Sequence, residues 1–144
     1  MVERSSNTRL RQTVAARAHY CCEYCKSQQR FSADPFSVEH IIPRSKGGKS
    51  HVSNLGFSCQ GCNNHKYTFT EARDPVSGER VSVFHPRRQE WNEHFVWNRD
   101  YSLIIGITPT GRATVAQLKL NQPGIVNLRR VLYTIGEHPV VFED

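Results

Sequence analysis

Residues 22–66 read CEYCKSQQRFSADPFSVEHIIPRSKGGKSHVSNLGFSCQGCNNHK, with a Cys-x-x-Cys pair at the start and a second near the end. Two such pairs, Cys22/Cys25 and Cys59/Cys62, can bring four thiolates to one tetrahedral metal ion, and we expect them to form a closed, structural Zn²⁺ site. Cys21 could replace Cys22 as a ligand, although the two-residue spacing favours Cys22. A thioredoxin-like redox pair is the rival interpretation, but the βαβ context that it requires is missing.

The 33 residues between the two pairs, 26–58, are too many for an ordinary zinc ribbon and predict further structure inside the frame. Apolar and β-branched residues indicate a strand near 36–41, limited by Pro43, and a returning strand over 54–59. The glycines of 45–50 indicate a loop between them. A helix is expected to begin near Gly61 and to run through 63–70.

Apolar spacing before and after this frame predicts further elements. A short helix over 6–19 would lead into the first cysteine pair. The second half predicts a short strand over 81–84, an aromatic-rich core segment over 90–97, a strand over 101–108, a turn over 109–111 and helices over 112–120 and 124–135. We therefore expect one α+β domain over 1–144, made of an N-terminal helix (1–20), a zinc-stapled core (21–70) and a C-terminal extension (71–144) whose role the sequence leaves open.

Length and composition restrict the class of protein. With 144 residues, 38% hydrophobic and 22% charged, the chain can bury a core of its own. We find no apolar run of membrane-spanning length and no secretory signal, which predicts a cytoplasmic protein without a membrane partner. The net charge of +6 comes entirely from residues 1–66, where ten Lys/Arg face four acids, as is typical of a surface that meets a polyanion.

Four residues inside the frame have side chains suited to phosphodiester hydrolysis. Glu39 and Asn63 offer hard oxygen ligands of the kind that Mg²⁺ accepts beside phosphate oxygens. His40 has an intrinsic pKa suited to taking a proton from an attacking water, and the Asn54 amide could orient that base. Because neighbouring strand residues point to opposite faces, Glu39 and His40 can both reach one site only at a strand end or bulge.

The order of these residues resembles the HNH endonuclease family, in its zinc-stapled, cysteine-containing branch. The matching text covers about 15–70 and consists of Cys22-Glu-Tyr-Cys25, Glu39-His-Ile-Ile-Pro43, Gly47-Gly48, Asn54-Leu55 and Cys59-x-x-Cys62-Asn63-x-x-Lys66. The resemblance implies a ββα-metal (His-Me finger) fold that cleaves DNA with one divalent cation, Mg²⁺ or Mn²⁺, per active site.

The resemblance also assigns roles to individual residues. It makes His40 the general base, Asn54 the residue that steadies it, Glu39 and Asn63 the ligands of the catalytic cation, and the four cysteines the zinc ligands. Two positions depart from the usual pattern: Glu39 stands where Asp is more common, and Asn63 stands where the family name has a His.

Basic side chains near the expected base support a nucleic-acid partner. Arg44, Lys46 and Lys49 follow His40 within nine residues, and Lys66 could touch phosphate from the helix. The arginine pairs 87–88 and 129–130 could extend this surface. We expect a DNA nuclease that nicks one strand per active site, as a monomer or a dimer. The alternatives are a non-catalytic zinc module that binds nucleic acid and, least favoured, a thiol redox protein.

Overall fold

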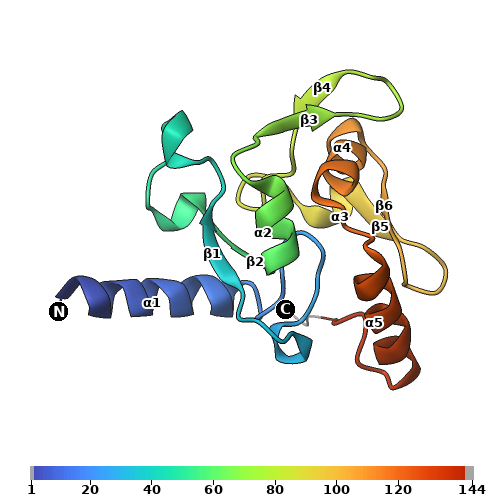
Figure 1. The fold of residues 1–144 in the computed structure, drawn as a ribbon, viewed down its shortest axis with the longest axis horizontal. Coiled ribbons are helices and arrows are strands. Elements are labelled where there is room, and N and C mark those ends of the chain that lie inside the picture. The colour runs from blue at the N-terminus through green and yellow to red at the C-terminus, as the bar shows by residue number, and fades with distance from the viewer. Residues whose placement is uncertain (1, 142–144) are drawn as a thin grey trace.

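The structure is a computed structural model that describes residues 2–141, with side chains from residue 8 onward. In this range the chain is α+β, as predicted, and its helices and strands follow one another as shown in Figure 1. The elements are α1 (Val2–Arg17), η1 (Gln29–Phe31), β1 (Ser37–His40), η2 (Arg44–Lys46), η3 (Val52–Asn54), β2 (Leu55–Ser58), α2 (Gln60–Lys66), β3 (Glu71–Arg73), β4 (Arg80–Ser82), α3 (Trp91–His94), β5 (Phe95–Trp97), β6 (Ile104–Gly106), α4 (Pro109–Leu118) and α5 (Pro123–Thr134), where η marks a short 3₁₀ helix.

The predicted hairpin is confirmed. β1 and β2 pair antiparallel, with Glu39 opposite Gly56 and His40 opposite Leu55. Every residue of β2 is buried, and the rings of Phe36 and Phe57 pack 5.4 Å apart between centroids. α1 extends from the hairpin to one side of the molecule, and α2 packs against β1 (Figure 1).

α2 begins where the sequence predicts and ends four residues earlier. Cys59 caps its N-terminus, with Sγ accepting from the backbone N–H of Cys62. Tyr67 takes a positive φ of 47°, which stops the helix after Lys66. The chain then enters β3, an unpredicted strand that pairs with β4.

The second half also departs from prediction around Pro109. The turn expected at 109–111 is wrong, because these residues form the first turn of α4. Thr108 caps that helix, its Oγ1 accepting from Gly111 N at 3.0 Å, and Pro109 occupies a first-turn position where its missing N–H costs nothing. The strand expected over 101–108 is confirmed only as the three residues of β6. The two C-terminal helices are confirmed as α4 and α5.

One hydrophobic core runs through both halves of the described chain. It joins Val14 of α1 and Phe57 of β2 to Phe84, Phe95 and Leu118 of the second half, all nearly inaccessible to solvent. Trp91 and Trp97 pack against this core, as predicted for the aromatic segment. Residues 71–141 therefore pack against the segment that carries the four cysteines.

Among residues 2–141, none of the helices combines the length and the apolar character that a bilayer crossing demands.

Candidate active site

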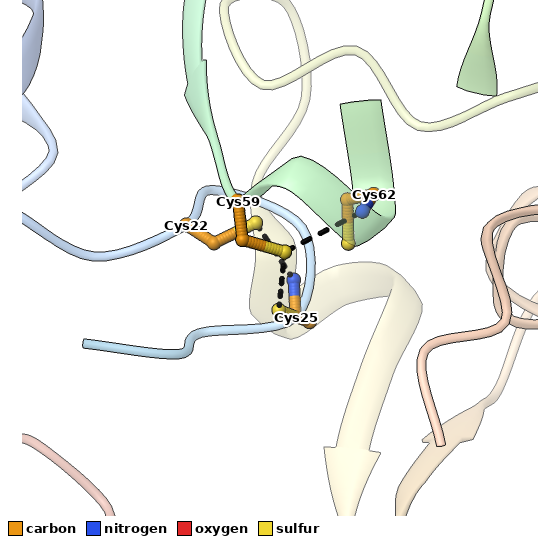
Figure 2. Close-up of side chains that lie close together, drawn as sticks. All are labelled: Cys22, Cys25, Cys59 and Cys62. Carbon is orange, nitrogen blue, oxygen red and sulfur yellow. Dashed lines mark hydrogen bonds between the residues drawn. The ribbon is translucent and has the colours of Figure 1, made fainter. Parts of the chain in front are cut away.

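The four predicted cysteine ligands converge in the structure (Figure 2). Cys22, Cys25, Cys59 and Cys62 are buried, and their sulfur atoms lie within 4.8 Å of one another, with 3.6 Å between Cys25 Sγ and Cys59 Sγ. A tetrahedral zinc with Zn–S bonds of about 2.3 Å requires sulfurs roughly 3.8 Å apart. The donor set and its spacing therefore fit Zn²⁺.

Two backbone bonds orient these thiolates. The N–H of Cys25 points to Cys22 Sγ at 3.5 Å, and the N–H of Cys62 points to Cys59 Sγ at 3.4 Å. Cys21 lies outside the cluster and donates to the carbonyl of His19 at 3.5 Å. The placement of the sulfurs thus favours Cys22 over Cys21 as a ligand.

The Glu39 side chain points from β1 into the protein, where it contacts Tyr24 and Lys66. Only 6% of the residue is exposed, and its two carboxylate oxygens have different partners. The hydroxyl of Tyr24 donates to Oε1, and the ammonium of Lys66 lies 3.2 Å from Oε2. Burial raises the pKa of Glu39, and the neighbouring Lys66 acts in the opposite direction.

Lys66 does not reach the surface, so the prediction that it touches DNA phosphate is wrong for this structure. It is 1% exposed, and its Nζ donates to the carbonyl of Ile41 at 2.8 Å as well as pairing with Glu39. An ammonium on the inner face of a helix is stable only when such partners satisfy it. The residue therefore links α2 to the end of β1 from the inside.

Tyr24 joins the cysteine frame to Glu39 and was not singled out from the sequence. It lies within the first Cys-x-x-Cys pair and is fully buried. Burial and the adjacent Glu39 charge raise the pKa of Tyr24 well above its usual range, so the phenol remains a donor. Glu23, the preceding residue, accepts from the N–H of Phe57 at 2.9 Å and pairs with Arg87. Their place between two ligands was the available signal.

His40 points to the other face of β1, as the alternation of a strand requires. Its Nε2 lies 2.8 Å from Ser50 Oγ and accepts from Arg44 Nε at 3.4 Å. A guanidinium can only donate, so Nε2 carries the lone pair and Nδ1 the hydrogen. Partial burial, together with Arg44, lowers the pKa of His40, which keeps the imidazole neutral near pH 7. The ring borders a shallow cavity of about 240 Å³ shared with α1.

Asn54 holds the loop that follows His40. Its Oδ1 accepts from Ile42 N, and its Nδ2 donates to the carbonyls of Ile42 and Lys49, all at 2.9 Å. Gly48 lets the loop close this tightly, because a Cβ there would lie 1.6 Å from Ile42 O. The amide thus fixes the backbone that carries Arg44 and Ser50 rather than touching the imidazole itself.

The remaining predicted residues lie around these two faces. The side chains of Arg44, Lys46 and Lys49 are exposed, and Lys46 Nζ donates to Thr68 O at 2.9 Å. Asn63 is half-buried on α2, one turn before Lys66. Within the described residues, none of the side-chain hydrogen bonds joins Asn63 to Glu39 or His40.

Two arginines that the sequence placed on a possible DNA surface have internal partners. Arg129 is 4% exposed and donates to the carbonyls of Ser102, Leu120 and Cys25 at 2.9, 2.7 and 3.3 Å. Arg87 pairs with Glu23. These two side chains hold the second half of the chain against the cysteine frame, and only Arg88 and Arg130 of the two pairs remain exposed.

An antiparallel hairpin followed by a helix, closed by four thiolates, defines a zinc-type ββα module. Residues 22–69, a third of the chain, match the family model described as HNH endonuclease, and the four close cysteines of this segment are consistent with its zinc-stapled form. Comparison with curated proteins and with solved structures gave no match.

The ion pair inside this module predicts a pH-dependent loss of stability. Replacing Lys66 with methionine leaves the Glu39 carboxylate buried without its cationic partner, which we expect to cost about 3–5 kcal/mol at pH 7. Burial already raises the pKa of Glu39 above 4.5, and loss of Lys66 raises it further. The folded variant then holds a proton that the unfolded chain releases, so its stability recovers as the pH falls toward 4.5.

Urea denaturation of the metal-loaded proteins at pH 7 and pH 5 measures this difference. Lys49→Met, which removes an exposed ammonium from the loop, is the control and should cost little at either pH. An equal loss for Lys66→Met at both pH values would assign the effect to packing rather than to charge.

Proposed function

We propose that this chain is a metal-dependent DNA endonuclease that nicks one strand per active site, with His40 as the general base. The observation that carries the proposal is the His40 imidazole at the end of β1, whose Nε2 accepts from Arg44, within the segment that matches the HNH endonuclease model and beside an exposed basic loop. Its unprotonated Nε2 can accept the proton of an attacking water. Arg44 contacts the same nitrogen and can also pair with a phosphate oxygen. Its positive charge lowers the pKa of the imidazole.

Glu39 and Asn63 are the residues that would hold the catalytic cation. Their oxygens suit Mg²⁺ or Mn²⁺; Glu39 belongs to β1, and Asn63 belongs to α2, the helix that packs against that strand. Glu39 would share its carboxylate between Lys66 and the ion. When bound, a divalent cation supplies charge stabilisation at the phosphate and the leaving oxygen.

The opposite orientations of Glu39 and His40 are compatible with one scissile phosphate at the end of the strand. His40 is the last residue of β1, and the loop fixed by Asn54 begins two residues later. A phosphodiester lying across this end can approach both faces of the strand. Arg44, Lys46 and Lys49, exposed on the same loop, would bind neighbouring phosphates without reading the base sequence.

Supercoiled plasmid incubated with the protein and Mg²⁺, Mn²⁺ or no divalent cation tests this proposal. We expect open circles with either metal and none without, since each active site cuts one strand. Retardation of the plasmid on a gel without cleavage under any metal would instead favour the non-catalytic zinc module.

The environment of His40 also predicts the acid limb of the activity profile. A general base works only when unprotonated, and burial with Arg44 lowers the pKa of His40 below 6.5. Nicking should therefore fall only below pH 6.5 in the parent, and Arg44→Ala should move this midpoint upward toward 6.5. Rates of nicking measured across pH give the midpoint independently of any loss of affinity.

Lys49→Ala is the matched control, because it removes a cation from the same loop without touching His40. It should weaken binding and leave the midpoint in place. An unchanged midpoint in Arg44→Ala would remove His40 from the role of the titrating base.

A further inference from the structure

A second site lies on the inner side of the same strand end. A cavity of about 420 Å³, which we call the β3–β4 cavity, opens between the end of β1, α2 and the segment after β4. Ile41 and Ile42, the residues after His40, form one wall, and His85, Arg88 and Gln89 of the C-terminal half form another. The family match ends at residue 69, so most of the lining residues of this cavity lie outside the matched segment.

The charge of the lining suits an anion. Lys46, Lys66 and Arg88 line the cavity, against one acid, Glu71. Lys66 is already neutralised by Glu39, which leaves the exposed Lys46 and Arg88 as the available cations. Within the described residues, the Arg88 guanidinium forms no hydrogen bond or ion pair.

His85 adds a donor that lacks an acceptor. Its Nδ1 accepts from the backbone N–H groups of Arg87 and Arg88 at 3.2 and 3.3 Å, which places the hydrogen on Nε2. Nε2 is buried and is without a hydrogen-bond partner within the described residues. Burial and Arg88 lower the pKa of His85 to about 4, so the ring remains a neutral donor. A buried donor without an acceptor is uncommon and indicates a missing partner.

We propose that the β3–β4 cavity binds a backbone phosphate of the DNA strand that crosses the end of β1, with Arg88 supplying the charge and His85 Nε2 a neutral hydrogen bond. The site rests on the proposed function and extends it to residues outside the HNH segment. Lys46 connects the β3–β4 cavity with the basic loop beside His40, since it belongs both to that loop and to the cavity lining. A strand can therefore pass from Arg44 over Lys46 to Arg88.

Binding measured apart from cleavage tests the site. In the His40→Ala background, the anisotropy of a short fluorescein-labelled duplex gives the affinity at KCl concentrations from about 50 to 250 mM. Each lost phosphate contact should reduce the magnitude of the slope of log K against log [KCl] by about 0.9. Arg88→Ala should show this reduction, whereas Arg130→Ala, which removes an exposed arginine of α5, should keep the parent slope.

His85→Phe separates the hydrogen bond from the charge. It removes the Nε2 donor without changing the net charge, so affinity should fall at every salt concentration while the slope stays at the parent value. Parent slopes in Arg88→Ala, or parent affinity in a folded His85→Phe variant, would overturn the site while plasmid nicking by the parent upholds the endonuclease. Absence of duplex binding by the parent background would overturn both.

Discussion

Replacing His40 with alanine is expected to slow nicking of supercoiled plasmid by about 10²–10⁴-fold, the usual contribution of a positioned general base. The reason lies in the contacts of the ring. Nε2 accepts from Arg44 and lies beside Ser50, so the lone pair that would take the proton faces the basic loop. Burial and Arg44 lower the pKa of the imidazole, which is therefore unprotonated near neutral pH.

The rest of the molecule should be unaffected by this change. His40 makes no bond to the cysteine frame, and we expect one zinc per chain and the parent melting temperature in His40→Ala. His51→Ala is the control, because it removes an exposed imidazole eleven residues further along the same loop region. Parent rates in His40→Ala, or an equal loss in His51→Ala, would exclude His40 as the base.

The sequence predicted the hairpin and the metal frame because their signals are local. Apolar, β-branched residues bounded by Pro43 and by glycines indicate β1 and β2, and the spacing of the cysteines indicates the site that ties them to α2. The prediction of a turn at Pro109 was wrong for a physical reason. Proline both limits strands and begins helices, and here the cap at Thr108 decides for the helix.

The buried charges could not be predicted, because their partners are distant in sequence. Helical spacing places Lys66 near the face of Asn63 but does not say that this face turns toward Glu39, 27 residues earlier. The same holds for Arg129, whose guanidinium donates to the carbonyl of Cys25, and for Arg87, which pairs with Glu23. These arginines were expected on a DNA surface but instead join the two halves of the fold. His85 was identified as a candidate donor only from the structure, because its Nε2 lacks an acceptor.

Removing the zinc should unfold the domain, and Cys59→Ser should do the same. Zn²⁺ binding to a structural thiolate site is worth about 10–16 kcal/mol, whereas a small domain is stable by about 5–15 kcal/mol in total. Cys59 has two roles: it is in the thiolate cluster, 3.6 Å from Cys25 Sγ, and it caps α2. α2 has seven residues, too few to persist without the frame that holds it.

A metal ion held by the four cysteines would add a direct link between segments that also share the hydrophobic core. Cys22 and Cys25 follow α1, Cys59 links β2 to α2, and Cys62 lies in α2. Without an ion, these four buried thiols have no common partner. Cys21→Ser provides the matched control, since Cys21 is also buried but its thiol lies outside the cluster and donates to the carbonyl of His19. We expect Cys21→Ser to retain one zinc per chain and a cooperative thermal transition, and Cys59→Ser to lose both when zinc content and circular dichroism are measured. A chelator-treated chain that kept its transition would mean that the core from Val14 to Leu118 is sufficient without the metal.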